Sequence, residues 1–132
     1  MFITIQTASQ VPLYEQVVEQ VKELVAKGII EEGEKLPSVR DLSSQIVLNP
    51  NTVSKAYKEL ERQGVIITLR GKGTFVADAS KRMSDPRKRE AVKKQIQKLV
   101  IEANYADVSK EKFVNWVNKE FQALEGKKSD ED

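Results

Sequence analysis

Hydrophobic residues near the start of the chain recur at the spacing of an amphipathic helix. Between Pro12 and Gly28 they follow the i, i+3, i+4, i+7 pattern that gathers side chains on one helix face. The stripe consists of Tyr14, Val17, Val18, Val21, Leu24 and Val25. Proline is tolerated at a helix start and glycine is common just after a helix end. Pro12 and Gly28 therefore predict the two boundaries of a first helix.

A second, short helix is predicted at Ser38. Serine is a preferred N-cap residue, and Asp41 follows at the position where a capping box carries a carboxylate. The inner face of this helix is expected to be Val39, Leu42 and Ile46.

A third helix is predicted from about residue 51 to residue 63, because Asn49 can cap it, Pro50 can occupy its first position and Gly64 can end it. Its buried stripe is Val53, Ala56, Tyr57 and Leu60. The opposite face carries hydrogen-bond donors and no carboxylate: Asn51, Lys55, Lys58 and Arg62. A helix that enters the major groove of DNA needs such a face, although exposed lysines and arginines are often merely solvated.

After the third helix, the helical stripes give way to two short runs of strand-forming residues. Residues 65–69 (VIITL) and 74–78 (TFVAD) are rich in β-branched side chains, and residues 70–73 (RGKG) lie between them. Two such runs joined by a glycine-containing loop predict a β-hairpin. The loop tip carries two cations beside glycines, which suits close approach to a narrow groove, and an ordinary turn is the alternative.

Two further helices are predicted in the remainder of the chain. Asp85 and Pro86 begin the first, and Ser109 caps the second after a break at residues 104–108. Their apolar positions are Val92, Ile96, Leu99 and Ala103 in the first, and Phe113, Trp116, Val117, Phe121 and Leu124 in the second.

Composition restricts the chemistry that is available. The chain contains neither Cys nor His, so disulfides and thiolate metal sites are excluded, and the commonest general base and zinc ligand are missing. We therefore expect no cofactor, no metal and no enzymatic activity. No apolar stretch is long enough to span a membrane, and the N-terminus lacks the pattern of a secretory signal. The expected location is the cytoplasm, without a membrane partner.

The charge is unevenly distributed along the chain, although its net value is only +2. Residues 1–77 carry nine basic and nine acidic side chains, residues 78–98 carry eight and three, and residues 99–132 carry five and eight. The basic stretch comprises Lys81, Arg82, Arg87, Lys88, Arg89, Lys93 and Lys94. It is either a solvated linker and helix face or a patch that faces phosphates.

The order of the predicted elements indicates a mostly α fold with a small β-hairpin. Two helices joined by a tight turn, with a third before them, form a helix-turn-helix, and a hairpin directly after the last helix makes it winged. We expect a winged helix-turn-helix DNA-binding domain over residues 1–77. A two-helix dimerisation appendage over residues 78–126 and a disordered acidic tail over residues 127–132 would follow it.

Residues 36–42 (LPSVRDL) resemble the L-P-S-x-R-x-L signature of the GntR family of bacterial transcription regulators. The similarity covers residues 10–77 and continues at residues 12–16 (PLYEQ), 49–53 (NPNTV), 56–57 (AY), 60–61 (LE), 64 (G) and 70–76 (RGKGTFV). The length and helix count of the remainder are similar to those of the YtrA-like subfamily. The resemblance implies a winged-helix, dimeric regulator of transcription. Because YtrA-like regulators often lie beside genes for ABC transporters, it also suggests control of transport or stress genes.

The family's DNA contacts correspond to nine positions of this chain. They are Ser38 and Arg40 at the second helix, Asn49, Asn51, Thr52 and Lys55 around the third helix, and Arg70, Gly71 and Lys72 at the wing tip. One departure is visible, because Val47 stands where members of the family often have glycine. Glycine would allow a positive φ there, so Val47 predicts an altered turn or local strain.

The two C-terminal helices are expected to pair with a second chain. Two helices form a single thin layer and cannot bury all of their apolar side chains against each other. The predicted dimer interface is Val92, Ile96, Leu99, Ala103, Phe113, Trp116, Val117 and Phe121. The alternative is a monomer in which these helices fold back on the winged helix.

Three classes of function can be compared. The first is a dimeric repressor that binds a (pseudo)palindromic operator in double-stranded DNA. The second, an enzyme, is disfavoured, because Gly73 stands where a phosphate-binding loop needs Ser or Thr. The third is a winged-helix adaptor that binds only proteins, since a fold does not fix a function. The sequence does not identify the operator, the regulated genes or a small-molecule effector. It also does not show whether the protein represses or activates transcription.

Overall fold

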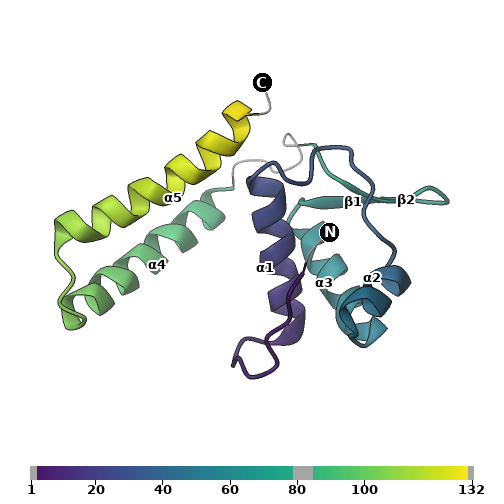
Figure 1. Cartoon of the computed structure of the whole chain (residues 1–132), viewed down its shortest axis with the longest axis horizontal. Helices are drawn as coiled ribbons and strands as arrows, with labels where there is room; N and C mark the ends of the chain where they lie inside the picture. The colour runs from purple at the N-terminus through teal and green to yellow at the C-terminus, as the bar shows by residue number, and fades with distance from the viewer. Residues whose placement is uncertain (1–2, 79–84, 131–132) are drawn as a thin grey trace. The chain divides into compact units, whose positions relative to one another are not determined.

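The computed structural model describes residues 3–78 and 85–130 of the 132-residue chain. The chain divides into two compact units, Met1–Arg82 and Met83–Asp132. The elements are α1 (Leu13–Ala26), α2 (Val39–Ile46), α3 (Pro50–Arg62), β1 (Ile66–Leu69), β2 (Gly73–Val76), α4 (Pro86–Tyr105) and α5 (Lys110–Asp130). This order confirms the predicted fold class, a winged helix-turn-helix followed by two helices (Figure 1).

The core of the first unit lies where α1 and α2 pack against α3, and where α3 packs against β1 of the hairpin. Its largest fully buried side chains are Val17, Val21, Leu42, Val53, Leu60, Ile66 and Val76. All of them lie on the apolar stripes or strands that the sequence predicts. Full burial of such a side chain contributes about 1.5–3 kcal/mol, so this core fixes the position of α3.

Both predicted caps of the helix-turn-helix are present. The Oγ of Ser38 accepts a hydrogen bond from the backbone N–H of Asp41 at 3.0 Å. The Oδ1 of Asn49 accepts one from the N–H of Asn51 at 2.8 Å, and Pro50 is the first residue of α3. These side chains satisfy amide groups that a helix start leaves without intrahelical partners.

The hairpin is antiparallel, with Ile66 opposite Val76 and Leu69 opposite Gly73. Its tip projects beyond the three helices of this unit (Figure 1). The segment before α2 pairs with the free edge of β2, because Val76 N–H donates to Glu34 O at 2.9 Å. The sequence does not predict this third strand-like segment.

An N-terminal arm, residues 3–6, lies along α1 and was not predicted. The side-chain amide of Gln20 both donates to Thr4 O (2.7 Å) and accepts from Thr4 N–H (2.9 Å). The buried side chain of Gln16 makes the same pair of bonds with Gln6, at 3.0 and 2.8 Å. The side chains of two glutamines one helical turn apart thus make the hydrogen bonds to the arm that the backbone of a neighbouring strand would otherwise make.

In the second unit, α4 and α5 run in opposite directions (Figure 1). Asp85 caps α4 by accepting from Arg87 N–H at 2.8 Å, and Ser109 accepts from Lys112 N–H at 3.2 Å. No side chain of α4 is buried, and neither is any described side chain of α5. The helix α5 includes residues 127–130 of the segment that is expected to be a disordered tail. No proline stops it there, and Lys is a good helix former.

Some of the sequence predictions concern residues outside the described ranges, namely Lys81 and Arg82 of the basic stretch and the last two residues of the tail. Within the described ranges, none of the helices combines the length and the apolar character that a membrane crossing requires.

Candidate nucleic-acid interface

The outer face of α3 is exposed, as the sequence predicts. Asn51, Lys55, Lys58 and Arg62 are all exposed, while Thr52 is half-buried at the first turn. The core holds the opposite side of the helix through Val53 and Leu60, which are fully buried. The amide of Asn51 and the hydroxyl of Thr52 therefore stand at the N-terminal end of α3, the end that meets base edges in helix-turn-helix proteins.

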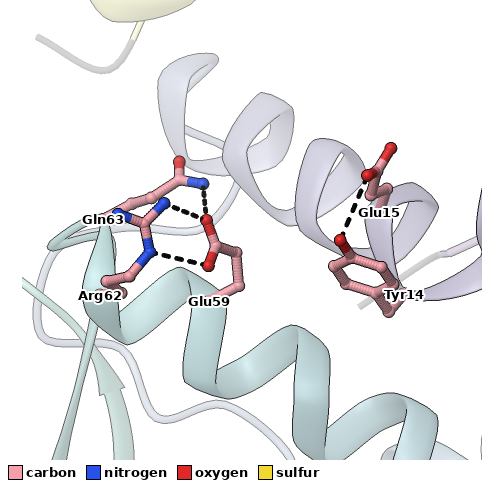
Figure 2. A network of polar contacts seen from close by, with 5 residues as sticks. All are labelled: Tyr14, Glu15, Glu59, Arg62 and Gln63. Atoms are coloured by element: carbon pink, nitrogen blue, oxygen red, sulfur yellow. Dashed lines mark hydrogen bonds and ion pairs between the residues drawn. The ribbon is translucent and has the colours of Figure 1, made fainter. Parts of the chain in front are cut away.

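Two cations of this face have partners within the protein. The Nζ of Lys55 lies 4.0 Å from the ring centroid of Tyr14, which is a cation–π contact between α3 and α1. Arg62 donates from Nε to Glu59 Oε2 at 2.9 Å, and a second bond runs to the other carboxylate oxygen (Figure 2). Glu59 precedes Arg62 by three residues, a spacing at which two helical side chains are close enough for an ion pair.

Figure 2 also shows how the polar groups around α1 and α3 are arranged. The Glu59 carboxylate accepts from Arg62 and from Gln63 Nε2, and these bonds lower the pKa of Glu59 to about 2. The Tyr14 hydroxyl donates to Glu15 Oε1 at 3.2 Å, and this bond to a carboxylate raises the pKa of Tyr14. Glu59 is therefore ionised at neutral pH and forms an exposed ion pair with Arg62.

The start of α2 is fixed to α3 through a buried tyrosine. The Tyr57 hydroxyl donates to the carbonyl oxygen of Pro37 at 2.7 Å, and burial raises the pKa of Tyr57 to about 12. Tyr57 consequently remains a protonated donor at neutral pH. It sets the position of Ser38, whose side chain serves as the cap, and of Arg40, which is exposed in the first turn.

The turn between α2 and α3 contains the predicted irregularity. Val47 has φ 53° and ψ 54°, the left-handed conformation that favours glycine, and its side chain is 87% exposed. The N–H of Val47 and that of Leu48 both donate to Ser43 O. Two residues later, Asn49 uses its Oδ1 as the cap of α3, and its NH₂ group has no hydrogen-bond partner among the described residues.

The wing tip consists of Arg70, Gly71 and Lys72, all exposed. Gly71 has φ 78°, and a Cβ built on it would meet nothing within 4 Å. The turn is closed by a bond from Lys72 N–H to Leu69 O at 2.9 Å. The glycine therefore serves the backbone conformation and leaves open space beside the two cations.

All nine predicted contact residues lie on the first unit, at the start of α2, in the turn before α3, in the first two turns of α3 and at the wing tip. That these nine residues contact DNA remains a prediction. The sequence reasoning missed the supporting roles of Tyr14 and Tyr57 and did not single out Lys35. The stripe position of Tyr57 indicated burial only, and nothing local indicates its bond to a carbonyl twenty residues away. No cluster of acidic side chains suited to a metal ion occurs in the described ranges.

The residues predicted for a dimer interface lie on α4 and α5 and are largely exposed. Leu99 is 53% exposed and Phe121 is 60% exposed. Ala103 and Phe113 are half-buried, and Val92, Ile96, Trp116 and Val117 are exposed. Sequence reasoning missed further exposed apolar side chains, among them Val100, Ile101 and Val114.

A comparison with known proteins identifies the family to which this chain is similar. Residues 13–76 match the family described as bacterial regulatory proteins, gntR family. The HTH-type transcriptional repressor YtrA of Bacillus subtilis (strain 168) is 50% identical over 130 residues, which cover 97% of this chain and 99% of that protein.

Two solved structures are also similar. One, described as a transcriptional antiterminator from Listeria monocytogenes EGD-e, has a TM-score of 0.85 and 45% identity and covers 94% of this chain and 92% of that chain. The other, AraR(DBD) in complex with operator ORE1, has a TM-score of 0.50 and 30% identity over 58% of this chain and 94% of that chain. The chain belongs to the GntR family of bacterial regulatory proteins and is a DNA-binding transcriptional regulator rather than an enzyme.

Proposed function

We propose that this regulator is a dimeric repressor that binds a (pseudo)palindromic operator. Repression is supported by the 50% identical relative, which is a repressor. The proposal includes a location in the cytoplasm and control of transporter genes, the class of genes implied by the resemblance to the YtrA-like subfamily.

The observation that carries the proposal is the set of exposed donors at the start of α3. Asn51 is exposed and Thr52 half-exposed there, on a helix whose other side is held by the core. An asparagine amide can donate to and accept from an adenine edge in the major groove, and a threonine can bond to several bases. The similar AraR domain, which was solved with its operator, supports this use of the fold.

The remaining contacts are assigned to the DNA backbone and to the minor groove. Arg40 in the first turn of α2 and Lys55 on the outer face of α3 are exposed cations that fit phosphates. Arg70 and Lys72 at the wing tip fit the narrow groove beside it, where negative potential attracts cations. Ser38, Asn49 and Gly71 determine the local conformation of the protein main chain that presents these side chains.

Dimerisation is supported by the exposed apolar faces of α4 and α5. Large apolar side chains such as Leu99 and Phe121 are more than half exposed, although soluble proteins rarely leave extended apolar patches in water. A second copy related by a two-fold axis would cover the same face on both chains. It would also present two winged helices to the two half-sites of an operator.

The proposal is tested on duplex DNA from the region upstream of the protein's own gene. Footprinting locates the operator, and binding is then measured against salt for the wild type, Asn51→Ala and the matched control Asn115→Ala on α5. Asn51→Ala is expected to weaken operator binding by about 1–3 kcal/mol and to relax sequence preference, whereas Asn115→Ala does neither.

Lys55→Ala is expected to weaken operator and unrelated DNA alike and to lower the salt slope by about one, as a phosphate contact would. A wild-type protein without salt-dependent DNA binding would contradict the proposal and favour the protein-binding adaptor.

A further inference from the structure

Lys35 lies next to the wing although it precedes α2 in the sequence. It forms an antiparallel bridge with Phe75, and Leu36 N–H donates to Thr74 O at 2.8 Å. Since β2 pairs with β1 along one edge, this segment occupies the other edge. The wing therefore has a third strand-like segment, and Lys35 is a residue of that segment.

The side chain of Lys35 is directed toward the wing tip. Gly73 and Phe75 are two residues apart on β2 and share a face of the sheet, so Gly73 is the diagonal neighbour of Lys35. A Cβ built on Gly73 would lie 2.8 Å from Lys35 Cε and 3.5 Å from Nζ. The lysine stem thus crosses the position that any other residue at 73 would fill. Because Gly73 is the first residue of β2 after the tip, the ammonium lies on the tip side of the bridge.

Lys35 adds a positive charge to the wing, whose tip already carries Arg70 and Lys72. Lys35, Arg70 and Lys72 are exposed, and no ion pair to any described residue neutralises them. Three positive groups supplied by two segments distant in sequence therefore gather on one end of the sheet. Such a cluster is unfavourable in the free protein and becomes favourable when a polyanion binds.

We propose that Lys35 is the third cation of the wing and binds a DNA backbone phosphate beside the groove that Arg70 and Lys72 approach. Gly73 keeps open the space across which the Lys35 side chain reaches that phosphate. This inference rests on the proposed function, because it requires the wing to contact DNA. A lysine ammonium is a point charge on a flexible stem, so the contact adds affinity on any sequence and carries no base preference.

The test compares Lys35→Gln with Lys35→Arg, which keeps the charge, and with the control Lys22→Gln, which removes an exposed lysine from α1. Binding to the operator duplex and to an unrelated duplex of equal length is measured over a range of salt concentrations. Lys35→Gln is expected to weaken both complexes by a similar factor and to reduce the slope of log K against log salt by about 0.9. Lys35→Arg and Lys22→Gln should keep the wild-type slope.

Arg70→Gln, measured in parallel, separates failure of this inference from failure of the proposed function. If Arg70→Gln lowers the slope and Lys35→Gln does not, the wing binds DNA without Lys35 and the inference is wrong. If neither variant changes the slope, the wing does not contact DNA, and that part of the proposed function is wrong as well. Thermal unfolding of each variant confirms that the compared proteins are folded.

Discussion

At the scale of single residues, Val47 adopts a conformation that its side chain disfavours. A β-branched residue at φ 53° is a strained position, and the left-handed region costs an L-residue about 1–2 kcal/mol. Burial does not offset this cost, because the side chain is 87% exposed. The turn is held instead by the two bonds to Ser43 O and by Leu48, which packs against the core.

Val47→Gly is therefore expected to stabilise the protein. Glycine relieves the left-handed strain, and its greater freedom in the unfolded chain removes part of the gain, which leaves about 0.5–1 kcal/mol. Chemical denaturation measures the free energy of unfolding. Val11→Gly is the matched control, because Val11 is also exposed and does not have a positive φ, so glycine there should be neutral or destabilising. A loss of stability in Val47→Gly would show that the turn is not strained.

At the scale of elements, the sequence predicts what is encoded locally. The starts of α2, α3 and α4 follow from Ser38, Asn49 and Asp85, whose side chains bond to amide groups two or three residues away. The hairpin follows from β-branched runs around glycines. The sequence predicts either an altered turn or local strain at Val47, and the positive φ of this residue corresponds to the second alternative.

Elements that depend on distant partners were not predictable. The N-terminal arm is held by Gln16 and Gln20, whose spacing indicates only a shared helix face. The third segment of the wing pairs across about forty residues of chain, and no turn signal marks it. The same holds for Lys55, whose contact with Tyr14 depends on how α1 packs against α3.

The bond between Tyr57 and Pro37 is the element-scale contact that joins α3 to the start of α2. Tyr57→Phe removes only the hydroxyl and leaves the carbonyl of Pro37 without this donor. The expected loss is about 1–2 kcal/mol of unfolding free energy. It is measured as a lower urea midpoint at an unchanged m-value. Tyr105→Phe is the control, because Tyr105 is 86% exposed and should lose almost nothing. Equal midpoints for the two variants would contradict a structural role for this bond.

At the scale of the whole molecule, the two units differ in how completely each buries its own apolar side chains. The first unit buries a continuous core from α1 to β2. The second buries no side chain of α4 and none of the described side chains of α5. A helix pair without a buried core gains little from folding alone, so the stability of this unit is expected to depend on protein concentration.

The apolar stripe predicted for the dimer interface lies on one face of α4, so substitutions on that face and on the opposite face can test the proposed dimer. Val92, Ile96 and Leu99 lie on one helix face, whereas Ile101 lies on the opposite face. Leu99→Asp places a charge in the proposed seam, where desolvation without a partner is costly. This variant is expected to sediment as a monomer at micromolar concentration and to bind the operator much more weakly than the wild type.

Ile101→Asp is the matched control for Leu99→Asp. Leu99 and Ile101 are similarly exposed, at 53% and 58%, so the two substitutions introduce the same charge at similarly accessible positions of one helix. Only the face differs. Sedimentation equilibrium should give a dimer for the wild type and for Ile101→Asp, and a monomer for Leu99→Asp. A monomeric wild type would exclude the interface, and a monomeric Ile101→Asp beside a dimeric Leu99→Asp would move the seam to the other face of α4.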